Sequence, residues 1–482
     1  MAERTPMPDV IVLIPGILGS VLVKDGKTLW GPKWSAIAGV IPVWGKSLEM
    51  LTVVDDDPEH DLGDGISASE VMPDVHLIPG FWKIDGYSTT RTELLRNFDV
   101  TLGENLFEFP YDWRRDNRYS AKKLQEQADI WLNAWRTKSG NADAKLIIIG
   151  HSMGGLVARY FIEVLGGWKS TRALITFGTP YRGAGKALGV LVNGVDKAFG
   201  LVDASAFVRS LTSVYQLLPT YKCFDEGDGK LVHLRRANLP AGVDGLRVRT
   251  AWFEFHDRIA KSELANRAEA DYPTFGSQPG FPIRAVVGLR STTLSTGFLN
   301  GDKLELLADS RLQRGEGDGT VPRISATPTP SFVSSAYTST KHASMQGVTD
   351  VLTDLFGFIT SLYADVGTFL GPGDERPKAT FDCDDAYRLG DSIVIDARLE
   401  RPDRDHLLTA TITPAGTGVA RSINLSSSDG ETFSGELLGL EAGSYRIDLA
   451  SSDSMPQHER IEPASDVFVV FNEHAQEAAV TS

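Results

Sequence analysis

Cysteine is scarce in this chain of 482 residues, which contains only Cys223 and Cys383. So few thiols exclude a small secreted fold that depends on several disulfides. The pattern favours two reduced, structural side chains over a disulfide between them. A reducing compartment is the environment in which such thiols persist.

Long hydrophobic runs are also missing. No apolar stretch approaches the roughly 20 residues that a membrane-spanning helix needs, so none is expected. The run Val10–Ile14 is short, ends at Pro15 and Gly16, and lacks the basic leader and small-residue cleavage site of a signal peptide. We expect it to be a buried strand. The missing signal-peptide pattern, together with the reduced cysteines, predicts a cytoplasmic location.

Basic charge is in deficit, with 48 Lys and Arg against 63 Asp and Glu, which gives a net charge of −15. From residue 371 onward there are 21 acidic and 9 basic residues, so most of the excess lies there. An acidic protein gains nothing from counterion release, and we expect no nucleic-acid partner. Attraction to an anionic membrane through the C-terminal part is not expected either.

The pattern of apolar and polar residues along the chain changes near residue 371. Residues 1–370 alternate strand-like and helix-like segments, and 146–149 is a continuous apolar run typical of a strand buried on both faces. This predicts an α/β fold with a mostly parallel sheet covered on both sides. Residues 371–377 are predicted to be a linker. Short alternating runs in 378–482 predict a C-terminal all-β sandwich of immunoglobulin-like type, which could bind a protein partner.

Two stretches of the first part fit the alternation poorly. Residues 20–85 are rich in Gly and Pro around several tryptophans, and residues 183–280 interrupt the sheet pattern. Long insertions between core strands are usually functional, so both are predicted to be lids or caps.

The sequence at 150–154 is Gly-His-Ser-Met-Gly, which matches the G-x-S-x-G pattern. A buried strand precedes it and an amphipathic helix follows it, which is the context of the nucleophile in an α/β-hydrolase. Ser152 is therefore predicted to be the nucleophile, rather than part of a structural Gly-rich turn. His151 is predicted to be structural, because its side chain points away from that of Ser152.

A serine nucleophile needs a base and an orienting acid, which follow it in the order acid, then histidine. His342 directly precedes the last helix of the first part and is the predicted base, with His233 and His256 as weaker alternatives. Asp318, between two glycines, is the predicted acid, and Glu316 is the fallback. Two backbone N–H groups must bind the oxyanion. We expect one from Met153 and one from the loop 15–19.

An acidic cluster lies between residues 55 and 64, but it lacks the spacing of a calcium-binding loop. We interpret it as a solvated loop. Its members are Asp55, Asp56, Asp57, Glu59, Asp61 and Asp64.

Four segments resemble the lecithin:cholesterol acyltransferase family, in that family's order: residues 12–19, 109–114, 150–155 and 317–321. The Tyr-Asp-Trp-Arg segment at 111–114 is the most diagnostic, because general α/β-hydrolases lack it. The resemblance implies a triad of Ser152, Asp318 and His342, with Ile17 and Met153 as oxyanion donors. It also implies that Tyr111–Arg114 is structural, that Trp30 belongs to a lid over the acyl site, and that no metal or other cofactor is needed.

The function that these observations predict is hydrolysis of an acyl ester, of a lipid or phospholipid above all. Transfer of the acyl group to an alcohol is the close variant, and a non-catalytic scaffold on a hydrolase fold is the alternative of a different class. Trp30, Trp34 and Trp44 are predicted to touch an acyl chain or, transiently, a membrane, unless they are core residues of a small cap. A chain that ends near residue 370 is expected to fold and react on its own.

Overall fold

The computed structural model describes most of the chain. The described residues are 4–31, 48–73, 75–77, 83–194, 204–275, 278–308, 316–328, 333–363, 379–399, 406–415, 418–452, 454–455, 460–461 and 463–471. The predicted linker at 371–377, together with Trp34 and Trp44, lies outside them.

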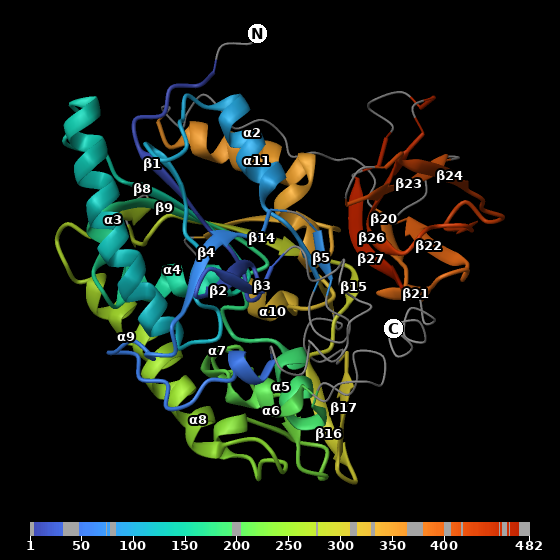
Figure 1. Ribbon diagram of the computed structural model, residues 1–482, viewed down its shortest axis with the longest axis horizontal. Coiled ribbons are helices and arrows are strands. Elements are labelled where there is room, and N and C mark those ends of the chain that lie inside the picture. The colour runs from blue at the N-terminus through green and yellow to red at the C-terminus, as the bar shows by residue number, and fades with distance from the viewer. Residues whose placement is uncertain are drawn as a thin grey trace.

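A six-stranded parallel sheet forms the centre of the first part, with the strands in the order β19-β14-β9-β8-β1-β7 (Figure 1). The predicted parallel α/β fold is thereby confirmed. The strands are β1 (Val10–Ile14), β7 (Leu106–Glu108), β8 (Leu146–His151), β9 (Thr171–Phe177), β14 (Ile283–Gly288) and β19 (Val333–Thr338).

Alternate residues of each central strand enter two different hydrophobic cores. In β8, Leu146 and Ile148 pack on one face with α3 (Asn117–Ser139) and α4 (Met153–Glu163). Ile147 and Ile149 pack on the other face with α2 (Ser88–Asn97) and α11 (Thr349–Ser361). Both faces are apolar because helices cover both, which explains the continuous hydrophobic runs of the strands.

The first insertion begins with a small antiparallel sheet in the order β3-β2-β4. Its strands are β2 (Ser20–Lys24), β3 (Lys27–Trp30) and β4 (Ile66–Val71), and the hairpin of β5 (Val75–Leu77) and β6 (Lys83–Asp85) follows.

The acidic segment at 55–64 is solvated only in part: Asp55, Asp57, Glu59 and Asp61 are exposed, as the sequence suggested, but Asp56 and Asp64 are not. Asp56 and Arg115 form an ion pair of 3.1 Å whose side chains are 4% and 2% exposed. Asp64 pairs at 2.9 Å with Arg114, whose side chain is fully buried. The carbonyls of Asp57 and His60 also accept hydrogen bonds from Arg115. These contacts join the first insertion to the segment that precedes α3.

Replacing Asp56 with alanine is expected to lower the free energy of unfolding by about 3–5 kcal/mol, because it leaves the buried charge of Arg115 without its partner. Urea denaturation of the variant and the parent measures this difference. Glu59→Ala is the control, since Glu59 pairs with Lys122 at the surface and should contribute at most about 1 kcal/mol. Equal losses in the two variants would contradict a structural role for the buried pair.

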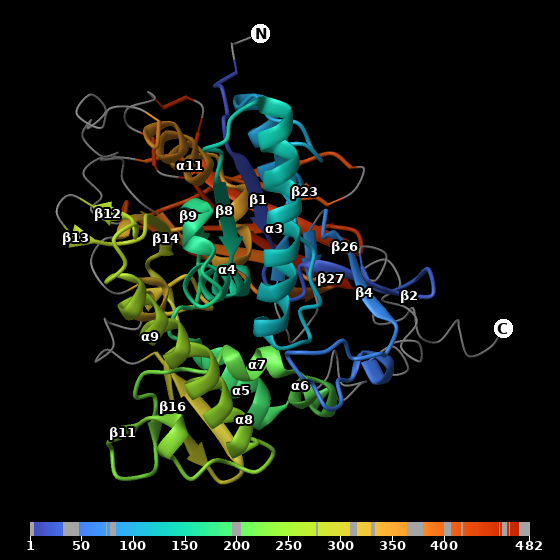
Figure 2. The same ribbon diagram turned by 90° about the vertical axis from the view of Figure 1, so that its left-hand side faces the viewer.

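The second insertion forms a cap at one end of the molecule, beyond the sheet, in both views (Figures 1 and 2). A four-stranded sheet, β11-β10-β16-β17, runs along it. Because β16 pairs with β10, and β17 pairs with β16, residues 296–307, which follow β14, also belong to the cap. The cap elements are α5 (Gly185–Asn193), α6 (Ser205–Ser210), α7 (Thr212–Gln216), β10 (Phe224–Asp225), β11 (Leu231–Val232), α8 (Gly245–Thr250), η4 (Ala251–His256), α9 (Asp257–Asn266), β16 (Thr296–Asn300) and β17 (Lys303–Leu307).

Several short elements complete the first part. They are the helical turns η2 (Gly167–Lys169), η3 (Leu234–Arg236), α10 (Arg323–Ala326) and η6 (His342–Gly347), and the strands β12 (Thr274–Phe275), β13 (Gln278–Pro279), β15 (Ser291–Thr292) and β18 (Glu316–Gly317).

The C-terminal part is all β, as predicted, with sheets in the orders β20-β22-β25 and β21-β27-β26-β23-β24. Side chains from both sheets, such as Ile395 and Phe468, share one hydrophobic core separate from those of the first part. The strands are β20 (Ala379–Asp382), β21 (Ala386–Arg388), β22 (Ile393–Leu399), β23 (Leu408–Pro414), β24 (Arg421–Leu425), β25 (Thr432–Leu437), β26 (Gly443–Ser451) and β27 (Ala464–Phe471).

The described residues contain neither a membrane-spanning helix nor a cluster of metal ligands. In that part of the chain no helix is long and apolar enough to cross a bilayer. The same residues contain no group of His, Cys, Asp and Glu side chains arranged to hold a metal ion.

Candidate active site

Ser152 lies on the sharp turn between β8 and α4, with a φ of +50° that non-glycine residues rarely adopt. Its N–H donates to the Phe177 carbonyl at 2.8 Å, which fixes the turn against β9. A Cβ at Gly154 would lie 2.4 Å from the Pro15 carbonyl oxygen, and one at Gly155 would strike Thr179. The close approach of these chains explains the glycines of the motif, and it presents the Ser152 hydroxyl at the carboxyl edge of the sheet.

His342 lies between the other two predicted members of the triad. Its Nε2 is 2.9 Å from Ser152 Oγ, and its Nδ1 is 2.7 Å from Asp318 Oδ2. All three residues are at most 7% exposed. They follow β8, β14 and β19, whose carboxyl ends lie at one edge of the sheet. The structure therefore brings together three residues that are far apart in the sequence.

Asp318 is held by backbone hydrogen bonds on its other side. Its Oδ1 accepts from the N–H groups of Thr320 at 2.9 Å and Val321 at 2.6 Å. The pairing of β15 with β18 carries this loop back to the end of β14. Glu316, the fallback acid, pairs instead with Arg323 at 3.5 Å. Only Oδ2 of Asp318 is left to face the histidine, which fixes the orientation of the ring.

The other histidines considered for the base lie in the cap. The ring of His233 contacts the Thr220 carbonyl through Nδ1 at 3.0 Å. His256 Nε2 donates to the Gln216 carbonyl at 2.7 Å, and burial lowers the pKa of its ring to about 4. Neither ring contacts Ser152.

The two residues predicted to supply oxyanion donors lie in segments next to Ser152. Met153 is the first residue of α4, where an N–H has no partner within its own helix. Ile17 lies in the loop after β1, and a Cβ at Gly16 in this loop would be 3.0 Å from that of Ser152. The loop therefore passes directly beside the nucleophile, in the position that a second oxyanion donor needs.

Four aromatic side chains hold the backbone of this oxyanion loop, defined as residues 15–20. Two of them belong to the Tyr-Asp-Trp-Arg segment, so that segment supports the active site. Leu18, at the centre of the loop, has a φ of +65°, a conformation that needs such support. The contacts are Tyr87 Oη with Gly16 N–H at 2.8 Å, Tyr111 Oη with the Pro15 carbonyl at 3.0 Å, Trp30 Nε1 with the Leu18 carbonyl at 3.0 Å and Trp113 Nε1 with the Ser20 carbonyl at 3.0 Å.

Trp30 is 3% exposed and packs edge-on against Trp113, with ring centroids 5.0 Å apart. Its indole N–H bonds to the loop and is not at the surface. The packing of Trp30 is that of a core residue, which was the alternative to lipid contact.

His151 connects the oxyanion loop to His342. Its Nε2 donates to the His342 carbonyl at 3.0 Å, so its Nδ1 must accept, and the Tyr87 hydroxyl lies 2.7 Å from that atom. Burial lowers the pKa of His151 to about 3, which keeps the ring neutral. The hydroxyl of Tyr87 thus accepts from Gly16 and donates to His151. Sequence reasoning missed Tyr87, which lies in no motif.

We expect Tyr87→Phe to lower the free energy of unfolding by about 1–3 kcal/mol and to reduce kcat, because it leaves buried polar groups at Gly16 and His151 without partners. Ester turnover and thermal unfolding measure the two effects. Tyr221→Phe is the matched control, since Tyr221 Oη donates to the Ser295 carbonyl within the cap. The control should lose stability and keep its kcat; a parallel fall of kcat in both variants would contradict the specific role of Tyr87.

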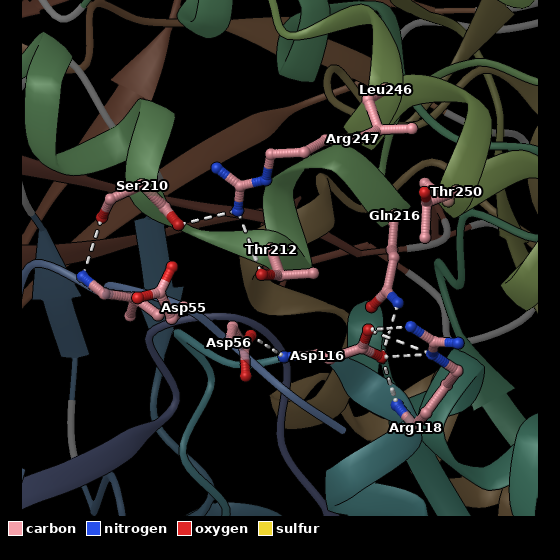
Figure 3. Close-up of a pocket in the computed structure, with 12 residues that line it drawn as sticks. Asp55, Asp56, Asp116, Arg118, Ser210, Thr212, Gln216, Leu246, Arg247 and Thr250 are labelled. Carbon is pink, nitrogen blue, oxygen red and sulfur yellow. Dashed lines mark hydrogen bonds and ion pairs between the residues drawn. The ribbon is translucent and has the colours of Figure 1, made fainter. Parts of the chain in front are cut away.

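A pocket of about 300 Å³ lies away from Ser152, between the 53–56 segment, the start of α3 and the cap (Figure 3). Its charged side chains bind one another and nearby backbone. Arg118 binds Asp116, and Arg247 donates to the carbonyls of Arg209 and Ser210 and to Thr212 Oγ1. The two arginines of the pocket are therefore already bound within the protein.

Known proteins resemble this chain over part of its length. Residues 81–311 match the family model described as lecithin:cholesterol acyltransferase, a span that contains Ser152 and ends before Asp318. The chain is similar to lysosomal phospholipase A and acyltransferase from Homo sapiens, with 28% identity over 262 residues, 52% of this chain and 59% of that protein. The same enzyme from Canis lupus familiaris is 25% identical over the same shares.

Lecithin-cholesterol acyltransferase-like 4 of Arabidopsis thaliana is 28% identical over 44% of this chain and 41% of that protein. The chain thus spans less than two thirds of the length of these relatives. A solved structure, Bacillus licheniformis lipase BlEst2 in propeptide form, covers 96% of this chain and 95% of its own at 11% identity and a TM-score of 0.34, too low to argue from. The matched segment and these relatives make the chain similar to the lecithin:cholesterol acyltransferase family over about half of its length.

Proposed function

We propose that this protein cleaves acyl esters of lipids through a covalent acyl-enzyme on Ser152. The observation that carries the proposal is the position of His342, which is within hydrogen-bond distance of both Ser152 and Asp318. A serine hydroxyl becomes a useful nucleophile at neutral pH only when a positioned base can take its proton.

In the proposed first half-reaction, Ser152 Oγ attacks the acyl carbonyl carbon and its proton passes to His342 Nε2. The negative charge that develops on the carbonyl oxygen is stabilised by the N–H groups of Ile17 and Met153. Asp318 stabilises the imidazolium that forms. The C–O bond to the leaving alcohol then breaks, and that alcohol takes the proton from His342.

The second half-reaction regenerates the serine. Water, or an alcohol, attacks the acyl carbon while His342 accepts its proton, and the proton returns to Ser152 Oγ when the acyl group leaves. Water gives a fatty acid and an alcohol gives a new ester, with the same protein groups in both cases. The human and dog relatives are both named as phospholipase A and acyltransferase.

The proposal is tested by incubating the protein with phosphatidylcholine vesicles, with and without a long-chain alcohol, and identifying the lipid products. Free fatty acid and lysophospholipid are expected without the alcohol, and a fatty-acyl ester of the alcohol indicates transfer. Products equal in the parent and in Ser152→Ala would refute the proposal. A non-catalytic scaffold would give no product from either.

Contact of the first insertion with a membrane remains a prediction that rests on Trp34 and Trp44. Replacing either with alanine is expected to reduce activity on long-chain lipid in vesicles much more than on a short soluble ester, since only the vesicle substrate needs an interfacial aromatic ring. Initial rates on the two substrates measure the difference. Equal losses on both would favour an ordinary packing role for these residues.

The predicted cytoplasmic location also remains a proposal. Its basis is the state of the two cysteines, both of which are free and buried. Free thiols of this kind are compatible with a reducing compartment.

A further inference from the structure

The residue that precedes His342 is bound by the C-terminal sandwich. Lys341 Nζ lies 2.8 Å from Asp466 Oδ2 of β27, and the two side chains are 18% and 1% exposed. The ammonium also lies 5.6 Å from the ring centroid of Phe381 of β20. Removing one partner from a pair buried this deeply leaves the other charge uncompensated, so the pair holds Lys341 against β27.

The residue that follows His342 is bound by the next residue of the same strand. Ala343 and Val467 are 4% and 0% exposed and form a small hydrophobic cluster that bridges the two parts of the chain. Two consecutive residues of β27 therefore bind the two neighbours of the catalytic histidine. All of η6, from His342 to Gly347, is buried.

The sandwich also packs on the hairpin that leads to Tyr87. Strands β26 and β27 lie against β5 (Figure 1). Strand β27 also lies against β6. At the other end of this hairpin, the Gly86 carbonyl accepts from Gln346 Nε2 of η6 at 3.4 Å. The sandwich thus contacts both η6, which begins at His342, and the hairpin that leads to Tyr87.

We propose that the C-terminal sandwich is a positioning element for the triad, with Lys341 and Asp466 as positioning residues for His342. The inference rests on the function proposed above, since it assigns a role at the same site. It replaces the expectation that a chain ending near residue 370 works alone. Such a chain would expose Ala343 and leave Lys341 without Asp466.

The physical reason is the narrow tolerance of the triad. His342 must stay within hydrogen-bond distance of two groups at once, and a shift of about 1 Å at a catalytic group can reduce the rate about 100-fold. Its neighbour Lys341 has extended backbone angles, φ −69° and ψ 156°, as the residue that precedes η6. The ion pair with Asp466 and the packing of Ala343 limit the movement of this segment on both sides.

The test uses full-length Lys341→Met and Asp466→Asn. Both are expected to lower kcat and the rate of fluorophosphonate labelling about tenfold or more, with KM within about twofold of the parent value. Lys341→Arg keeps the charge and should restore most of the rate. Asp448→Asn is the matched control, because Asp448 of β26 pairs with Arg446 inside the sandwich, at 2.9 Å.

A second readout does not depend on turnover. The proton between His342 Nδ1 and Asp318 gives a low-field proton NMR resonance, which should shift or broaden in Lys341→Met and Asp466→Asn and stay unchanged in Asp448→Asn. If the parent protein turns over no ester, the proposed function fails, and the resonance still decides this inference. Variants that melt earlier but keep the parental resonance and labelling rate would overturn it.

Discussion

Replacing Ser152 with alanine is expected to lower kcat for ester cleavage by a factor on the order of 10⁴–10⁶. The substitution removes the only atom that forms the covalent bond, and His342 then has no proton to accept from the enzyme. Initial rates with a soluble ester, at matched protein concentration, measure the loss. Near-ultraviolet circular dichroism should match that of the parent, because one hydroxyl is removed from a side chain that is 7% exposed.

Ser213→Ala is the matched control, since Ser213 is also buried and its hydroxyl donates to the Arg114 carbonyl, at 3.5 Å. The control should keep the parental rate. A Ser152→Ala variant that retains more than about a tenth of the activity would contradict the mechanism, since a lost triad member costs far more than that.

Asp318→Asn is expected to lower kcat by a factor on the order of 10⁴, through the tautomer of His342. The backbone N–H groups of Thr320 and Val321 will keep the amide oxygen at the Oδ1 position. The amide NH₂ then faces Nδ1 of the histidine, which must accept. Nε2 carries the ring proton in that tautomer and cannot take the one on Ser152.

Glu316→Gln controls for charge, because Glu316 lies two residues away and binds Arg323 instead of the histidine. Rates at several pH values separate a wrong tautomer from a shifted optimum, since no pH within the stable range should restore Asp318→Asn. If Glu316→Gln lost as much activity as Asp318→Asn, Asp318 would not be the specific partner of His342.

The nucleophile turn could be predicted because its signals are local. A continuous apolar run, a glycine-flanked serine and an amphipathic helix follow one another within about twenty residues, and they became β8, Ser152 and α4. The hydrogen bonds of His342 could be anticipated from chain order. The sheet order and the route of the Asp318 loop, through β15 and β18, could not.

The errors concern long-range partners. The acidic segment at 55–64 has the composition of a solvated loop, but Asp56 is neutralised by Arg115, about sixty residues away. Tyr87 carries no sequence signal, because its role depends on Gly16 and His151 lying on opposite sides of its hydroxyl. Gly178 did carry a sequence signal, because it directly follows a buried strand. In the structure, a Cβ at Gly178 would lie 2.8 Å from both Asp318 Oδ2 and His342 Nδ1.

The contacts between the C-terminal part and the first part could not be predicted for a similar reason. The change of hydrophobic pattern near residue 371 indicates a second hydrophobic core, and the structure contains that core. Amino-acid composition does not show which residues pack against the surface of this C-terminal part. The ion pair of Lys341 with Asp466 and the contact of Ala343 with Val467 can be recognised only in three dimensions.

The most direct test of the central claim is covalent labelling with a fluorophosphonate, followed by mass spectrometry of the intact protein and of its peptides. The account predicts one adduct per chain, located on Ser152, formed quickly by the parent protein and at least about a thousandfold more slowly by the Asp318→Asn variant, as expected for loss of the orienting acid. No adduct should form on Ser152→Ala. A parent protein that stays unlabelled, or an adduct on any other residue, would contradict it.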